Sequence, residues 1–75
     1  MTKLTKEIAP KLTQRERELL HGLKSGETDR EIASRLGVSE KTVSNHMRHL
    51  STKFAAKNRT HTLVLAVKMK LIELD

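Results

Sequence analysis

Residues 28–47 of the chain are TDREIASRLGVSEKTVSNHM, and this stretch predicts two helices joined by a tight turn. Thr28 and Glu31 have the spacing of a capping box, in which each side chain bonds to the backbone amide of the other residue. Gly37 is suited to end the first helix because glycine adopts a positive φ at little cost. We therefore expect a short helix over residues 29–36.

A longer helix is predicted over residues 40–54, with Ser39 as its N-cap. Its apolar residues recur at steps of four, three and four, which places them on one buried stripe. They are Val43, Met47, Leu50 and Phe54. A short helix, a turn that contains glycine and a longer second helix together match the helix-turn-helix motif, whose second helix enters the major groove of DNA.

The flanking sequence adds one helix on each side of this pair. Thr13 and Glu16 form another capping box, and Ser25-Gly26 ends the helix that follows it. A last helix is expected from about Arg59 to about Leu71. No segment alternates in the manner of a strand, so we predict an all-α fold with four helices.

Composition restricts the function. A chain of 75 residues forms one domain at most, and it has a formal charge of +6, which attracts polyanions. Cysteine is absent, and no nucleophile–base pair, carboxylate pair or phosphate loop has a useful spacing, so we expect no enzyme. Phe54 is the single aromatic residue, which disfavours proteins that stack single-stranded bases. No apolar run approaches the ~20 residues that cross a bilayer.

The polar side of the 40–54 helix carries the predicted DNA contacts. Arg48 can bond to guanine O6 and N7, and Asn45 can bond to adenine N6 and N7. Ser44 is short and can donate or accept, so it is expected to discriminate less between bases. Lys41 and Thr42 lie in the first turn, where the free backbone amides also favour phosphate.

The chain resembles the LuxR/GerE family of bacterial regulators over residues 12 to about 72. The resemblance rests on Leu-Thr-Gln-Arg-Glu at 12–16, Glu-Ile-Ala at 31–33, Ser-Glu-Lys-Thr-Val-Ser-Asn-His at 39–46 and Asn-Arg-Thr at 58–60. It implies a four-helix helix-turn-helix domain that regulates transcription and binds a two-fold symmetric site in double-stranded DNA as a dimer. A promoter-reading domain of a sigma factor is a related alternative, which His46 and the Asn58-Arg59-Thr60 segment disfavour.

Positions carried over from the family define the expected site. The resemblance implies that bases are contacted by Ser44, Asn45 and Arg48, and the DNA backbone by Arg30, Lys41, Thr42, His46, Lys53 and Arg59. It implies that Glu16 is structural and that the last helix forms the dimer contact. Because that helix has more apolar residues than one buried stripe needs, we assign the dimer interface to Val64, Leu65 and Lys68.

Three residues depart from the family pattern. Position 44 is commonly Lys or Arg in the family and is Ser here, so one cationic base contact is missing. Position 55 is usually Gly and is Ala here. If the turn still needs a positive φ at this position, the alanine is strained; otherwise the turn has changed or the third helix is longer. Position 70 is usually Gly and is Lys here, which suggests that the last helix continues toward Leu74.

The remaining expectations concern partners and context. Residues 1–11 are expected to be a flexible tail or linker, and residues 12–75 the DNA-binding domain. The chain fits either a stand-alone regulator or the output domain of a quorum-sensing or response regulator. We expect a cytoplasmic, nucleoid-associated protein with no cofactor. Its expected partners are a second copy, in a homodimer that is either stable in solution or formed only on DNA, and RNA polymerase. An alternative is a protein-interaction module that pairs with a full-length regulator and inhibits it. His46 and His49 have a spacing that could bind a metal, but a third ligand is missing.

Overall fold

The computed structural model describes residues 11–74, and within them the chain forms four helices and no strand. The helices are α2 (Gln14–Lys24), α3 (Asp29–Leu36), α4 (Glu40–Lys53) and α5 (Arg59–Lys68). The all-α prediction is confirmed, and α3 with α4 forms the predicted helix-turn-helix pair. Residues 1–10 of the predicted tail lie outside the described residues.

Both predicted capping boxes are present. The Glu16 amide donates to Thr13 Oγ1 over 3.1 Å, and the Thr13 amide donates to Glu16 Oε1 over 3.0 Å. Thr28 and Glu31 repeat the arrangement, with 3.1 Å for the bond from the Glu31 amide and 2.8 Å for the bond from the Thr28 amide. Each box satisfies backbone amides that a helix start leaves without a partner, which is why α2 and α3 begin where the sequence predicts.

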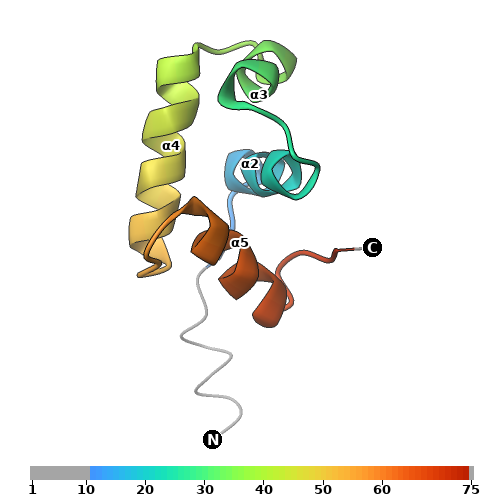
Figure 1. Cartoon of the computed structure of the whole chain (residues 1–75), viewed down its shortest axis with the longest axis vertical. Helices are drawn as coiled ribbons and strands as arrows, with labels where there is room; N and C mark the ends of the chain where they lie inside the picture. The colour runs from blue at the N-terminus through green and yellow to red at the C-terminus, as the bar shows by residue number, and fades with distance from the viewer. Residues whose placement is uncertain (1–10, 75) are drawn as a thin grey trace, which may run out of the picture.

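The core lies between α4 and the other helices. All four apolar residues of the predicted α4 stripe are buried, and they pack with buried side chains of α2, α3 and α5. The largest fully buried side chains from α2 and α3 are Leu19, Leu20 and Ile32. α4 stands at one edge of the molecule, with α3 beside its start and α5 beside its end (Figure 1). Its opposite side is therefore left uncovered by any other described helix.

α5 ends earlier than predicted. Its last residue is Lys68, so the expectation of a helix to Leu71, or on toward Leu74, is wrong. Lys70 adopts φ 60°, which reverses the chain, and the Leu71 amide bonds to the Ala66 carbonyl over 2.9 Å. The reversal brings Ile72 back onto the core with 6% of its surface exposed. Burial of Ile72 offsets the cost of a left-handed conformation at a residue with a Cβ atom.

The turn after α4 also keeps a left-handed residue. Ala55 has φ 54°, and the Ala56 amide bonds to the Ser51 carbonyl over 2.8 Å. α4 ends at Lys53 with Phe54 as its C-cap, so the third helix does not run longer. Of the alternatives that the missing glycine raised, the strained turn is the one that occurs.

Candidate nucleic-acid interface

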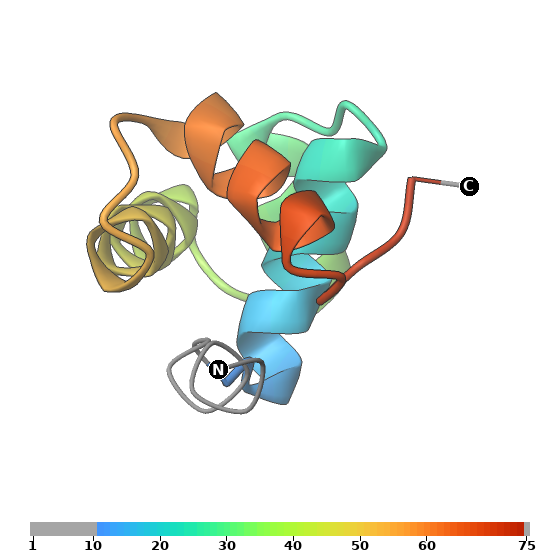
Figure 2. The ribbon, with the colours of Figure 1, turned by 90° about the horizontal axis from the view of Figure 1, so that it is seen from below.

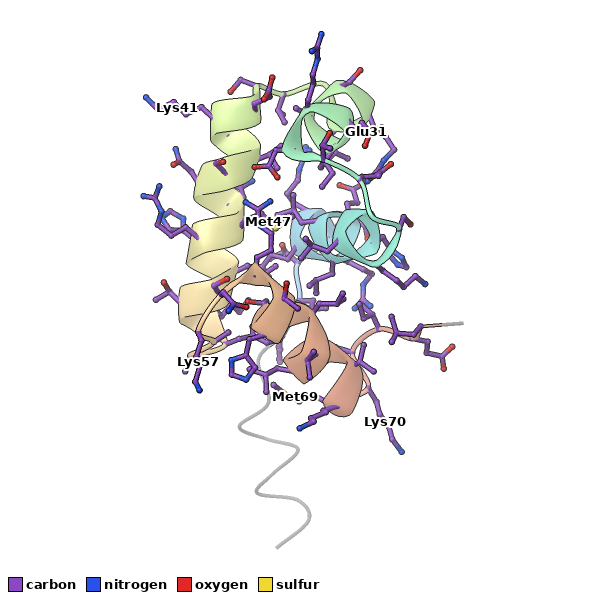
Figure 3. The ribbon with its side chains drawn as sticks, viewed as in Figure 1. Glu31, Lys41, Met47, Lys57, Met69 and Lys70 are labelled. Carbon is purple, nitrogen blue, oxygen red and sulfur yellow. The ribbon has the colours of Figure 1, made fainter. Side chains whose placement is uncertain are left out.

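The uncovered side of α4 is polar. Lys41, Arg48 and Thr52 are exposed there, and Asn45 is half-buried. Lys41 projects away from the other helices, whereas Met47 points toward α2 on the inner side (Figure 3). Two of the three predicted base contacts, Asn45 and Arg48, are therefore on the side of α4 that a DNA duplex can approach.

Ser44 has a different environment from the one expected. It lies on the flank of α4 and its hydroxyl donates to Asp29 Oδ2 over 2.9 Å. Arg59 donates to both oxygens of the same carboxylate, with Nη2 at 3.2 Å from Oδ2. The Arg59 hydrogen bond, aided by the one from Ser44, lowers the pKa of Asp29 below its ordinary value despite partial burial. Asp29 therefore stays ionised and joins α3, α4 and α5.

Lys53 also makes hydrogen bonds within the chain. Its Nζ donates to Glu16 Oε1 over 2.8 Å and to the Lys11 carbonyl. Partial burial raises the pKa of Glu16, but the Lys53 and Thr13 hydrogen bonds more than offset it, and the pKa lies below its ordinary value. Glu16 thus caps α2 and ties it to the end of α4, which agrees with the structural role that the family resemblance implied.

The other predicted backbone contacts lie around the start of α4. Arg30 and Lys41 are exposed, and Thr42 and His46 are half-buried. The Thr42 amide donates to Ser39 Oγ over 3.0 Å, which fixes the first turn of α4. These residues lie around the N-terminal part of α4. Contacts to the phosphates beside a major groove would require this position.

The residues assigned to the dimer interface differ in their exposure. Val64 is 43% exposed and Lys68 is exposed, whereas Leu65 is half-buried and packs against the core. On the inner side of α5, the buried Thr62 hydroxyl bonds to Ser51 of α4 over 2.7 Å. α5 is thus fixed to α4 and presents Val64 outward.

Sequence reasoning did not place three residues of this region at the candidate interface. Asp29 was seen only as the start of a helix, and no local pattern reveals its contacts with Ser44 and Arg59. His49 is exposed on α4, where the helical step of about 100° per residue would have placed it. Lys57 is an exposed cation directly before the N-cap of α5, a position that could have been noted from sequence.

The described residues were also compared with the requirements of a metal site and of a membrane-spanning helix. Within residues 11–74, no group of three or more His, Cys, Asp or Glu side chains is placed to hold a metal ion. In the same residues, no helix is both long and apolar enough to span a membrane.

Fold and site together define a helix-turn-helix DNA-binding domain. The family model described as bacterial regulatory proteins, luxR family, matches residues 10–66. The chain belongs to this luxR family, whose members are DNA-binding regulators of bacterial transcription and not a class of enzymes.

Individual relatives agree with this assignment. The spore germination protein GerE of Bacillus subtilis is 43% identical over 65 residues, which cover 87% of this chain and 88% of that protein. The uncharacterized transcriptional regulatory protein YhcZ of the same organism is 39% identical over 88% of this chain and 31% of its own length. The transcriptional activator protein SolR of Ralstonia nicotianae is 40% identical over 96% of this chain and 30% of its own length. The chain thus spans nearly all of GerE but less than a third of YhcZ and SolR.

Proposed function

We propose that this chain regulates transcription by binding a two-fold symmetric operator sequence in double-stranded DNA as a homodimer. The observation that carries the proposal is the uncovered polar side of α4, where Lys41, Asn45 and Arg48 are presented together. α3 and α5 pack against the other side of α4, which leaves this side free to enter a major groove.

Base recognition is assigned to Arg48, Asn45 and Ser44. Arg48 bonds to a guanine and Asn45 to an adenine through paired contacts at the edges of these bases. Ser44 contributes as a hydrogen-bond acceptor, because its hydroxyl hydrogen is donated to Asp29. An arginine pair and an asparagine pair give most of the discrimination, at about 1–3 kcal/mol each.

Backbone contacts are assigned to the cations and donors around α4. Arg30, Lys41, Thr42 and His46 position the helix without selecting sequence. Lys53 and Arg59 belong to the same set, but each already has a carboxylate partner, Glu16 and Asp29 respectively. They contact phosphates with the N–H donors that are not bonded to these carboxylates. We therefore expect substitution of Lys53 or Arg59 to weaken DNA binding less than substitution of the other four residues.

The homodimer is assigned to α5 through Val64, Leu65 and Lys68. An apolar side chain as exposed as Val64 on the outer side of a helix is a suitable centre for a small contact. GerE, which has nearly the same length as the matched region, is named a spore germination protein, and SolR a transcriptional activator. By similarity, this chain controls promoters.

Selection of binding sites from random duplex DNA, followed by titration of the selected site, tests the proposal. We expect a consensus with two symmetric half-sites about one helical turn apart. Arg48→Ala should cost about 1–3 kcal/mol of binding free energy and relax the preference at one base pair of each half-site. Arg35→Ala is the control because Arg35 lies on α3 and pairs with Glu27 over 2.7 Å.

A contrary result has a clear form. If no sequence is enriched, and binding is steeply salt-dependent and unchanged by Arg48→Ala, the chain binds DNA only through nonspecific charge attraction. The inhibitory pairing of α5 with another regulator would then be the function to examine.

A further inference from the structure

α5 has little buried apolar surface of its own. Its buried residues are Thr62 and Ala66, which both have small side chains, and its other apolar residues are partly buried or exposed. Thr62 lies near the start of the helix, where its hydroxyl bonds to Ser51 of α4. Ile72, which follows the helix, is larger and only 6% exposed. The far end of α5 is therefore held mainly by a residue that lies beyond it.

Residues 70–73, which we call the C-terminal strap, turn back from the end of α5 onto α2. Arg17 of α2 donates to the Leu71 carbonyl over 2.9 Å, and Lys24 donates to the Glu73 carbonyl over 2.8 Å. The two donors are two helical turns apart, so they lie on the same side of α2. Figure 2 shows the strap running along α2. Hydrogen bonds with an ionised donor are stronger than neutral ones, so the strap is firmly attached.

The strap lies away from the polar side of α4. It forms a shallow groove with Arg17, His21 and Lys24, and no residue of α4 lines this groove. Lys70 in the strap and Lys41 on α4 are at opposite sides of the molecule (Figure 3). A substitution in the strap, or at its contacts on α2, therefore changes no proposed DNA contact directly. Its effect on DNA binding has to pass through α5.

On the basis of the proposed homodimer, we infer that the C-terminal strap sets the tilt of α5 and thereby selects the spacing of the two operator half-sites. The start of α5 is fixed to α4 at Thr62, and its end is fixed to α2 by Arg17 and Ile72. Two separated attachments define the direction of the helix axis relative to α4.

Two-fold symmetry makes the spacing sensitive to this direction. A change in the tilt of α5 occurs in both protomers, so both contribute to the change between the two α4 helices. The separation of the two α4 helices has to match the separation of the half-sites along the duplex. Arg17 is thus a positioning residue, which acts on the operator through α5 and not by contact with DNA.

Titration of a series of duplexes tests this inference. The selected half-sites are placed at separations that differ by one base pair, and a duplex with a single half-site is included. Wild type should prefer one separation. Arg17→Met should weaken binding at that separation by about tenfold, the effect of one lost hydrogen bond to a charged group. The other separations should lose less affinity, and binding to the single half-site should stay within about twofold of wild type, since the Arg17 side chain makes no proposed DNA contact.

Each strap variant has a matched control. Arg35→Met removes the same charge from α3, where Arg35 pairs with Glu27 over 2.7 Å, and it should keep the wild-type preference. Ile72→Val should reduce the preference for one separation, because it removes a buried methyl group from the strap. Ile32→Val makes the same change at a fully buried residue of α3, so it should lower the Tm and keep the preference.

Amide hydrogen exchange in the free chain tests the strap without DNA. The amides of Met69 and Leu71 donate to carbonyls of α5 over 2.9 Å, and the Thr62 amide donates to the Asn58 carbonyl over 3.0 Å. In Arg17→Met, the Met69 and Leu71 amides should exchange faster than in wild type, while the Thr62 amide keeps its rate. Equal acceleration of all three amides would mean that Arg17 stabilises the whole domain, and no acceleration would mean that it does not hold α5. Either result overturns the inference.

Failure of this inference differs from failure of the proposed function. If wild type prefers one separation and Arg17→Met keeps that preference, the homodimer stands and the strap does not set the spacing. If Arg17→Met weakens the single half-site as much as the full site, the strap supports the domain as a whole and the inference is wrong. If wild type itself selects no symmetric site or prefers no separation, the proposed function fails, and the inference fails with it.

Discussion

At the scale of single residues, Ser44 shows how a neighbour can fix the direction of a hydrogen bond. A hydroxyl ordinarily donates and accepts, but the Ser44 hydrogen is directed to Asp29, whose pKa is lowered. The oxygen can then only accept, and in the major groove the matching donors are the amino groups of adenine and cytosine. On the proposed base contact of Ser44, we therefore expect Asp29 to set specificity without reaching a base.

Asp29→Asn tests this coupling. The new amide can accept from Arg59 through its oxygen and donate to Ser44 through its nitrogen, which frees the Ser44 hydrogen. We expect the preference at the base pair beside Ser44 to shift from adenine or cytosine toward guanine or thymine, measured by site selection. Ser44→Ala, the control, should remove the preference at that position, and an unchanged consensus in both variants would refute the coupling.

A second feature at the residue scale is the left-handed backbone of Ala55, which has φ 54°. Residues with a Cβ atom are disfavoured there by about 1–2 kcal/mol, whereas glycine is not. Ala55→Gly should stabilise the fold by about 0.5–1 kcal/mol after the extra entropy of the unfolded chain is subtracted. Thermal unfolding should show a higher Tm, while Ser34→Gly in the middle of α3 should lower it. A lower Tm for Ala55→Gly would mean that this turn is not strained.

At the scale of elements, the packing of α2 against α3 depends on a glycine. Gly22 is buried within α2, where alanine is normally the better helix former by about 1 kcal/mol. A Cβ atom at this position would lie 2.7 Å from the Ile32 side chain and 2.9 Å from Glu27 Oε1. Ile32 is fully buried, so it has little room to move away. Close approach of the two elements therefore opposes helix propensity.

Gly22→Ala is expected to destabilise the domain. Overpacking of a filled core typically costs about 1–3 kcal/mol, which exceeds the gain in helix propensity. The measurement is chemical denaturation followed by circular dichroism. His21→Ala, at the adjacent exposed position of α2, should be neutral or stabilising. Stabilisation by both substitutions would show that Ile32 can repack.

At the scale of the whole molecule, binding to a symmetric operator requires two copies of the chain. Val64→Asp should leave the Tm nearly unchanged, since Val64 is 43% exposed. It should abolish cooperative binding to the two-half-site operator but preserve binding to a single half-site, because a charge is placed in an apolar contact. Leu74→Asp is the control, being 56% exposed and lying beyond α5. Loss of cooperativity with Leu74→Asp alone would move the dimer contact to the C-terminal segment.

The helices and their starts follow from sequence because their causes are local. A capping box joins residues that are three positions apart, and the stripe from Val43 to Phe54 is defined by helical periodicity. The same local rules failed at the end of α5. Position 70 is Lys and not Gly, so the local sequence did not indicate a helix end there. The burial of Ile72, a tertiary effect, stabilised the left-handed conformation of Lys70.

The sequence by itself determined the all-α fold, the helix-turn-helix pair, the family and the outward position of Asn45 and Arg48. Only the tertiary structure decided which polar groups remain available to DNA. Ser44 and Arg59 are bound by Asp29, which is 15 and 30 residues away from them, and Lys53 is bound by Glu16 over a separation of 37 residues. Periodicity and capping act within a turn or two of one helix, whereas these pairs form only when separate helices are packed together.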